Sequence, residues 1–231
     1  MSGDETTARE GGASTARETA RKWLVLGGTV VPSIATVLVV GFVIARRPTL
    51  PPIDAGWHDT IAGFRHPVLD GLAHFLAVWG EKALGFGLFP ALLVVALFWS
   101  GRVWAVPGFL AAGVISLVVV QLAKHFIDRA RPDDILHLSD AGSFPSGHVA
   151  NAATLGMFVA LVYRRVWVWA ITVGYVLIMA FSRTYLHAHW LSDVLGAIIL
   201  GAAIAYAAYA LSTTPAAQAW RDRVRVRLVL G

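Results

Sequence analysis

Residues 23–45 read WLVLGGTVVPSIATVLVVGFVIA, a run of apolar and small residues that contains no charged side chain. At a rise of about 1.5 Å per residue, a helix of this length crosses the roughly 30 Å hydrocarbon core of a bilayer. The run is longer than the apolar core of a signal peptide, which has about 7–15 residues. It therefore predicts a membrane span that is not removed by cleavage.

Further runs of the same character follow along the chain. They predict membrane spans at residues 83–100, 103–123, 147–163, 166–182 and 190–212. We therefore expect an all-α fold, an integral membrane bundle of six transmembrane helices formed by residues 23–212. Between the first two spans, residues 49–82 mix prolines and aromatic residues with charges and histidines, which predicts an amphipathic segment at the membrane interface.

The composition of the whole chain is that of a membrane protein. Of 231 residues, 57% are hydrophobic and 14% are charged, whereas an average soluble domain has about 45–50% and about 25%. This composition excludes a secreted soluble enzyme and a disordered protein. The absence of cysteine excludes a disulfide scaffold, a thiolate nucleophile and a cysteine-based metal site. We assign the net charge of +5 to contacts with anionic lipid headgroups and expect no nucleic-acid partner.

The two polar ends of the chain are expected to lie in the cytoplasm. Residues 1–22 lack apolar periodicity and predict a disordered tail, and residues 213–231 predict a basic tail. Six spans place both ends on one side, which then carries 11 of the 19 Lys and Arg residues, against 8 on the other side. By the positive-inside rule the first side is cytoplasmic. All eight histidines fall on the other side, which is then the extracytoplasmic face.

Three clusters of polar residues lie at the extracytoplasmic ends of the last four predicted spans. The first cluster is Lys124 followed by Arg131-Pro132. A separation of seven residues is nearly two helical turns, so we expect both cations on one helix face, with Pro132 ending the helix. A lysine reaching for the interface and an arginine at a helix C-terminus would explain this cluster without any function.

The second cluster is Pro145-Ser146-Gly147-His148, just before the fourth predicted span. Ser146 is a good N-cap, Gly147 lets a ligand approach the backbone, and the free N–H groups of a first helical turn bind anions. An ordinary capped helix with an interfacial histidine is the alternative explanation.

The third cluster is Ser182-Arg183, then His189 and Asp193. A histidine and an aspartate at positions i and i+4 share one helix face, so the carboxylate could hold one ring nitrogen and leave the other as a nucleophile. A lone carboxylate within a predicted span is difficult to explain by structure alone. Together the three clusters suit phosphoryl transfer, which needs positive charge, in-line positioning and a proton donor.

The three clusters resemble the three-part signature of the type 2 phosphatidic acid phosphatase superfamily. All signature residues are present, in order, and with the expected six-span layout the resemblance covers residues 20–212. The residues that carry it are Lys124 with Arg131-Pro132, then Pro145-Ser146-Gly147-His148, then Ser182-Arg183 with His189 and Asp193.

This resemblance implies a role for each residue of the signature. His189 is the nucleophile that forms a phosphohistidine, Asp193 orients it, and His148 is the general acid. Neither a metal nor another cofactor is required. The resemblance implies that the phosphate is bound by Lys124, Arg131, Ser146, Gly147 and Arg183.

We therefore expect a membrane enzyme that hydrolyses a lipid phosphate or diphosphate. A polyprenyl diphosphate, phosphatidate and phosphatidylglycerophosphate are the candidate substrates, and the small size and the basic outer loop favour the polyprenyl lipid. The alternatives are a metal-binding membrane protein and a transporter that uses the His/Asp cluster as ligands. Three nearby cations disfavour a divalent ion, and the position of the polar groups at one face disfavours transport.

Several other polar residues have no assigned role in this prediction. We expect His125 and His187 to be interfacial or supporting residues. The loop between the third and fourth predicted spans contains five further charged residues, which either help to select the headgroup or are simply solvated. These residues are Asp128, Arg129, Asp133, Asp134 and Asp140.

Overall fold

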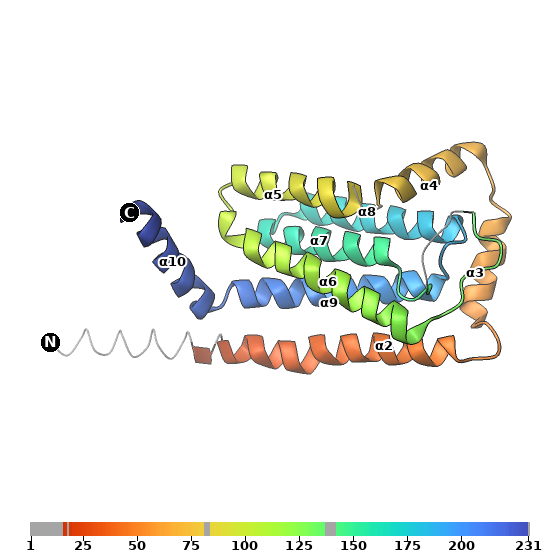
Figure 1. The fold of residues 1–231 in the computed structure, drawn as a ribbon, viewed down its shortest axis with the longest axis horizontal. Helices are drawn as coiled ribbons and strands as arrows, with labels where there is room; N and C mark the ends of the chain where they lie inside the picture. Colours follow the sequence, from red (N-terminus) through yellow and green to blue (C-terminus); the bar gives the residue numbers. More distant parts are fainter. Residues whose placement is uncertain (1–15, 18, 81–83, 137–141, 231) are drawn as a thin grey trace.

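The computed structural model describes residues 16–230 except residues 18, 81–83 and 137–141. All regular elements in this part of the chain are helices, as the sequence predicts (Figure 1). They are η1 (Leu26–Val30), α2 (Val31–Ala45), α3 (Pro52–Ala62), α4 (Pro67–Trp79), η2 (Leu84–Leu88), α5 (Phe89–Trp99), η3 (Val103–Ala105), α6 (Val106–Ile127), α7 (Gly147–Tyr163), α8 (Val166–Tyr185), α9 (Leu191–Ser212) and α10 (Pro215–Leu230).

The helix α7 forms the centre of the bundle. It packs most extensively against α9, and α8 and α6 cover its other sides. Contact between α7 and α9 depends on small residues, because a Cβ atom at Gly201 would lie 2.7 Å from the Cβ of Ala153 and 2.8 Å from the carbonyl oxygen of Ala150. Small residues that let two backbones approach closely are the usual means of helix packing inside a membrane.

The outer surface of the bundle is apolar, as expected of a surface that faces lipid. Four helices of the described residues are long and apolar enough to cross a membrane: Thr19–Ala45, Val103–Ile127, Val166–Tyr185 and Leu191–Ser212. Two further expected spans, 83–100 and 147–163, correspond to the shorter apolar helices Phe89–Trp99 and Gly147–Tyr163. The chain is therefore an all-helical integral membrane protein.

The segment expected at the interface folds into two helices, α3 and α4. In Figure 1 α3 lies across one end of the bundle, while α4 turns back along it. Both helices pack on α8, and α3 also packs on α9. The pair therefore covers the end of the bundle at which the three polar clusters lie.

The described chain begins and ends at the opposite end of the bundle from α3 (Figure 1). The first apolar helix already includes Thr19, so it starts before the expected boundary at Trp23. The predicted disordered tail otherwise lies mostly outside the described residues. The predicted basic tail contains the helix α10.

The close approach of α7 and α9 makes a prediction about stability. Gly201→Ala should lower the free energy of unfolding by about 1–3 kcal/mol, because the added methyl group overlaps α7. Gly174→Ala in α8 is the matched control, since nothing lies within 4 Å of its added methyl group. Thermal unfolding in detergent, followed by circular dichroism, measures both. Equal shifts in the two variants would contradict the close contact between α7 and α9.

Candidate active site

The first cluster lies where α6 ends, and its geometry differs from the prediction. The helix ends at Ile127, and Asp128 adopts the left-handed conformation with φ of 44°. Lys124 is therefore in the last helical turn, whereas Arg131 lies beyond the helix. The expectation that both cations share a helix face was wrong, because the chain turns before Pro132 is reached.

Lys124 and Arg131 nevertheless meet at one backbone carbonyl. The Nζ atom of Lys124 donates to the carbonyl oxygen of Gly142 at 2.6 Å, and Nη2 of Arg131 donates to the same oxygen at 3.0 Å. Gly142 has φ of 53°, and a Cβ atom there would lie 2.8 Å from the carbonyl oxygen of Lys124. A glycine is thus required where this loop returns against α6.

The second cluster forms the start of α7. Ser146 is the N-cap residue, as predicted by position, but its hydroxyl makes no capping hydrogen bond and is buried without a partner among the described residues. Its backbone N–H donates to the carbonyl of Asp193 at 3.3 Å, which fixes the start of α7 against α9. A Cβ atom at Gly147 would meet only Val120, at 3.7 Å. The fold itself therefore does not demand a glycine at this position.

His148 lies in the first turn of α7 and faces the end of α4. Its Nε2 atom is 3.2 Å from the carbonyl oxygen of Ala77. A Cβ atom at Gly80 would lie 2.2 Å from the His148 ring. The end of α4 therefore positions this imidazole.

The third cluster surrounds the turn between α8 and α9. Arg183, in the last turn of α8, is completely buried, and His189 is 4% exposed. The expectation that His189 and Asp193 share a helix face was wrong, because α9 begins at Leu191 and His189 precedes it. The ring Nδ1 of His189 lies 2.7 Å from the carbonyl oxygen of Ser143 and 3.6 Å from Oδ2 of Asp193.

This hydrogen bond determines the tautomer of His189. A carbonyl oxygen only accepts, so the proton is on Nδ1 and Nε2 keeps its lone pair. The Nε2 atom is 3.4 Å from Nη1 of Arg131, on the side of the ring that faces the cations. The arrangement presents an unprotonated nitrogen to an anion held by those cations.

Asp193 is held by partners other than the one expected. Its Oδ2 accepts the backbone N–H of Trp190 at 2.9 Å, and its Oδ1 accepts from Nη1 of Arg129. Nη2 of the same arginine donates to Oδ2 of Asp54 on α3 at 2.6 Å. Asp54 also binds the backbone N–H of Ser192 at 2.8 Å.

This network is not apparent from the sequence. Arg129 was assigned to the connecting loop, yet it is 4% exposed and Asp54 is 0% exposed. Its position two residues before Arg131 was the only available signal. Nothing in the sequence links Asp54 to Asp193, because 139 positions separate them along the chain.

Charged residues of all three clusters act on the His189 ring. Burial, and then the charges of Lys124, Arg131, Arg183 and His148, hold the pKa of His189 well below its ordinary value of 6.5. Each of these causes disfavours the protonated ring. The imidazole therefore stays neutral at neutral pH.

The other residues singled out in the sequence lie away from the residues that surround His189. His125 is exposed at the end of α6 and makes an edge-to-face contact with Phe126. His187 is buried, but its Nδ1 faces Asp134 at 2.6 Å. Asp128 and Asp133 are exposed, and Asp140 lies outside the described residues.

Comparison with known proteins identifies similar chains. Residues 102–216, which include all three clusters, match the model of the PAP2 superfamily. An undecaprenyl-diphosphatase of Sulfolobus acidocaldarius is 24% identical over 153 residues, covering 63% of this chain and 72% of that protein. A decaprenylphosphoryl-5-phosphoribose phosphatase of Mycobacterium tuberculosis is 32% identical over 139 residues, covering 58% of this chain and 73% of that protein.

A solved structure shares the fold. It is a transmembrane PAP2 type phosphatidylglycerolphosphate phosphatase from Bacillus subtilis, with a TM-score of 0.65 and 20% sequence identity. The match covers 83% of this chain and 97% of that chain.

Loss of the Arg129 side chain should destabilise the fold. Arg129→Met should lower the free energy of unfolding by about 3–5 kcal/mol, because it leaves two buried carboxylates without their shared partner. Arg129→Lys keeps the charge but cannot bridge both carboxylates, so it should fold and show a reduced kcat. Arg47→Met, at an exposed position, is the control. Wild-type stability of Arg129→Met in thermal unfolding would contradict the role of the network.

The lowered pKa of His189 should be visible in the pH dependence of the reaction. If the neutral ring attacks, kcat/KM should persist as the pH falls through 6.5 and decline only near the lowered pKa. Lys124→Met removes one charge that repels a proton from His189. The pKa of His189 should therefore rise, and the acid limb of the profile should move to higher pH. Profiles of kcat/KM against pH for the wild type and Lys124→Met measure the shift. Both are recorded on one substrate, so that the ionisation of the substrate affects both equally. Arg47→Met should leave the limb in place, and an unmoved limb in Lys124→Met would exclude this assignment.

Proposed function

The chain belongs to the PAP2 superfamily and is a membrane lipid phosphatase, and we propose that it cleaves its substrate through a phosphohistidine formed at His189. The observation that carries this proposal is the buried His189 ring. Its Nδ1 is held by the carbonyl of Ser143, and its Nε2 faces Arg131. A neutral imidazole with a fixed tautomer, surrounded by cations, is suited to attack an anionic phosphorus centre.

The proposed reaction has two steps. In the first, the Nε2 lone pair of His189 forms the N–P bond while the bond from phosphorus to the leaving oxygen breaks. His148 gives a proton to that oxygen. In the second, water attacks the phosphohistidine, His148 accepts the proton of the water, and the N–P bond breaks to release phosphate.

The charge on the phosphoryl group is balanced by side chains in this proposal. Lys124, Arg131 and Arg183 bind the phosphoryl oxygens, so that the chemistry requires no metal. The unpartnered hydroxyl of Ser146 and the backbone N–H of Gly147 are further donors at the start of α7.

Asp193 acts on the intermediate in this proposal rather than as the direct holder of the free ring. Phosphorylation of Nε2 places positive charge on the imidazole, and Oδ2 of Asp193 lies 3.6 Å from its Nδ1. An ion pair at this distance in a buried site stabilises the charged ring.

A polyprenyl-linked phosphate is the substrate that we favour. Two of the similar proteins carry polyprenyl lipids in their names, as an undecaprenyl-diphosphatase and a decaprenylphosphoryl-5-phosphoribose phosphatase. The apolar surface of the bundle suits a substrate whose chain stays in the bilayer while its phosphate reaches the cations. Phosphatidate and phosphatidylglycerophosphate are the alternative substrates.

The proposed topology has six spans with the active site outside the cytoplasm. The four long helices and the two shorter helices α5 and α7 make the six crossings, and α3 with α4 lies at the outer interface. The basic residues count 11 on the side of the termini and 8 on the side of the site. Three of those eight are the proposed phosphate ligands, which leaves 5 and strengthens the bias.

The chemistry is tested by phosphate release from purified protein in detergent. The panel contains a polyprenyl diphosphate, a polyprenyl monophosphate, phosphatidate and phosphatidylglycerophosphate, with a soluble aryl phosphate as control. With 32P-labelled substrate the wild type should form an acid-labile phosphoenzyme, and it should stay active in EDTA. His189→Gln should form no phosphoenzyme and release no phosphate from any substrate. Turnover by His189→Gln would contradict the mechanism, and dependence on an added metal would contradict the role given to the cations.

The topology is tested with single cysteines, because the natural chain contains none. Thr49→Cys lies in the connection before α3, and Gln218→Cys lies on α10 at the other end of the bundle; both positions are exposed. In intact cells a membrane-impermeant maleimide should label Thr49→Cys and not Gln218→Cys. Permeabilised cells, in which both should react, are the control. The reverse pattern would place the active site in the cytoplasmic leaflet.

A further inference from the structure

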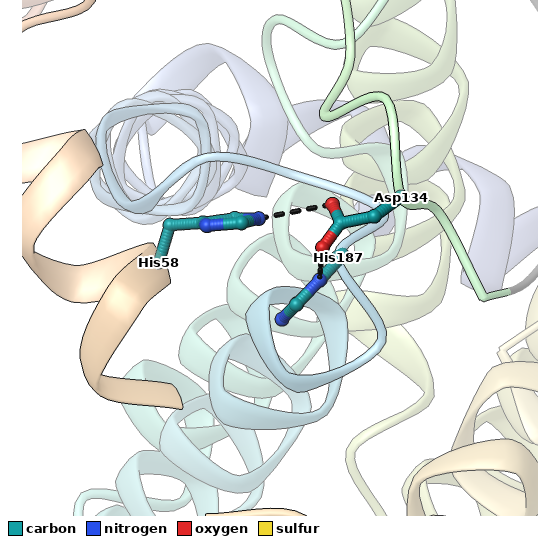
Figure 2. Close-up of side chains that lie close together, drawn as sticks. All are labelled: His58, Asp134 and His187. Carbon is teal, nitrogen blue, oxygen red and sulfur yellow. Dashed lines mark hydrogen bonds and ion pairs between the residues drawn. The ribbon is translucent and has the colours of Figure 1, made fainter. Parts of the chain in front are cut away.

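Two histidines and one aspartate form a second cluster outside the phosphate site. Figure 2 shows the carboxylate of Asp134 between His58 and His187. Nε2 of His58 lies 3.0 Å from Oδ1, and Nδ1 of His187 lies 2.6 Å from Oδ2. The two rings are 4.2 Å apart between centroids. One ligand atom from each residue can be chosen so that all three lie within 4.8 Å of one another.

The three residues come from separate parts of the fold. His58 is on α3, Asp134 follows α6, and His187 is in the turn between α8 and α9. His187 also has φ of 52°, in the left-handed region that favours glycine. A histidine in this conformation carries a backbone cost that a glycine would avoid.

A carboxylate lies at the centre of this cluster, whereas cations surround the phosphate site. Each oxygen of the Asp134 carboxylate faces one imidazole nitrogen. A second carboxylate, Asp59, lies 3.7 Å from Nδ1 of His58, on the other side of that ring.

We propose that His58, Asp134 and His187 bind a divalent cation of the zinc class. Two imidazoles and a carboxylate are a common ligand set for zinc, with water in the fourth position. Tetrahedral bonds of about 2.0–2.2 Å separate the ligand atoms by about 3.3 Å, so small side-chain shifts convert the present hydrogen bonds into coordination. The ring proton of His58 then moves to Nδ1, beside Asp59, as in carboxylate–histidine–metal arrangements. The ring proton of His187 likewise moves from Nδ1 to Nε2.

The bound ion would connect three elements at the end of the bundle. It ties α3 and the segment after α6 to the turn that carries His189, two residues beyond His187. The ion is thus a clamp on the active-site turn and takes no part in the phosphoryl transfer. This inference concerns residues outside the proposed catalytic machinery, so it does not depend on the mechanism proposed above.

Metal binding by the full chain tests the proposal. The protein is purified in detergent with an affinity tag that contains no histidine, stripped with EDTA and titrated with Zn²⁺ in a calorimeter. Co²⁺ serves as a second probe, because its visible absorption reports a tetrahedral site. We expect one ion per chain and an increase of the thermal unfolding midpoint when zinc is bound. The absence of stoichiometric binding to the wild-type protein would overturn the proposal.

Variants locate the site. Asp134→Asn keeps the shape of the side chain, and His187→Gly suits the left-handed backbone, so both should fold and release phosphate. Each should weaken zinc binding about tenfold or more and remove the zinc-dependent increase in the unfolding midpoint. His125→Gln, which removes an exposed histidine near the same end, should bind zinc normally. Wild-type binding by Asp134→Asn and His187→Gly would overturn the proposal, as would a loss confined to His189→Gln, which would move the ion to the phosphate site.

Discussion

The buried ion pairs of Arg129 are the interaction on which the rest of the site depends. One guanidinium group donates to Asp54 on α3 and to Asp193 on α9, and Asp54 in turn holds the backbone of Ser192. Burying a charge away from water is costly unless the charge is paired. Removal of Arg129, Asp54 or Asp193 would therefore leave a buried charge uncompensated. The network therefore fixes α3 across the end of the bundle and determines where α9 begins.

The position of α9 explains how the nucleophile is held. His189 lies just before the helix, so its Nδ1 meets the carbonyl of Ser143 instead of the Asp193 carboxylate. Ser143 belongs to the loop whose Gly142 carbonyl also accepts from Lys124 and Arg131. One short loop thus sets the tautomer of the histidine and the placement of two cations. The Ser143 carbonyl that accepts the Nδ1 proton of His189 is therefore next in the chain to the carbonyl that holds Lys124 and Arg131.

The sequence predicts the composition of this site well and its connections poorly. Apolar runs predict the helices because length and hydropathy are local properties, and the three clusters predict the residues that converge. The end of α6 was missed because it depends on Asp128 in a left-handed conformation. No proline or glycine at this position indicates that the helix ends. Asp54 and the Ser143 carbonyl were missed because their partners are distant in sequence, and a backbone acceptor leaves no signature in residue type.

The turn between α8 and α9 separates two electrostatic environments over two residues. His189 faces Lys124 and Arg131, which keep it neutral and attract an anion. His187 faces the Asp134 carboxylate, which suits a cation instead. His187 has a left-handed backbone, and its ring and that of His189 lie in different environments. A divalent ion on one side and a phosphate on the other can then occupy the same turn without sharing a ligand, so metal binding and metal-independent hydrolysis are compatible in one protein.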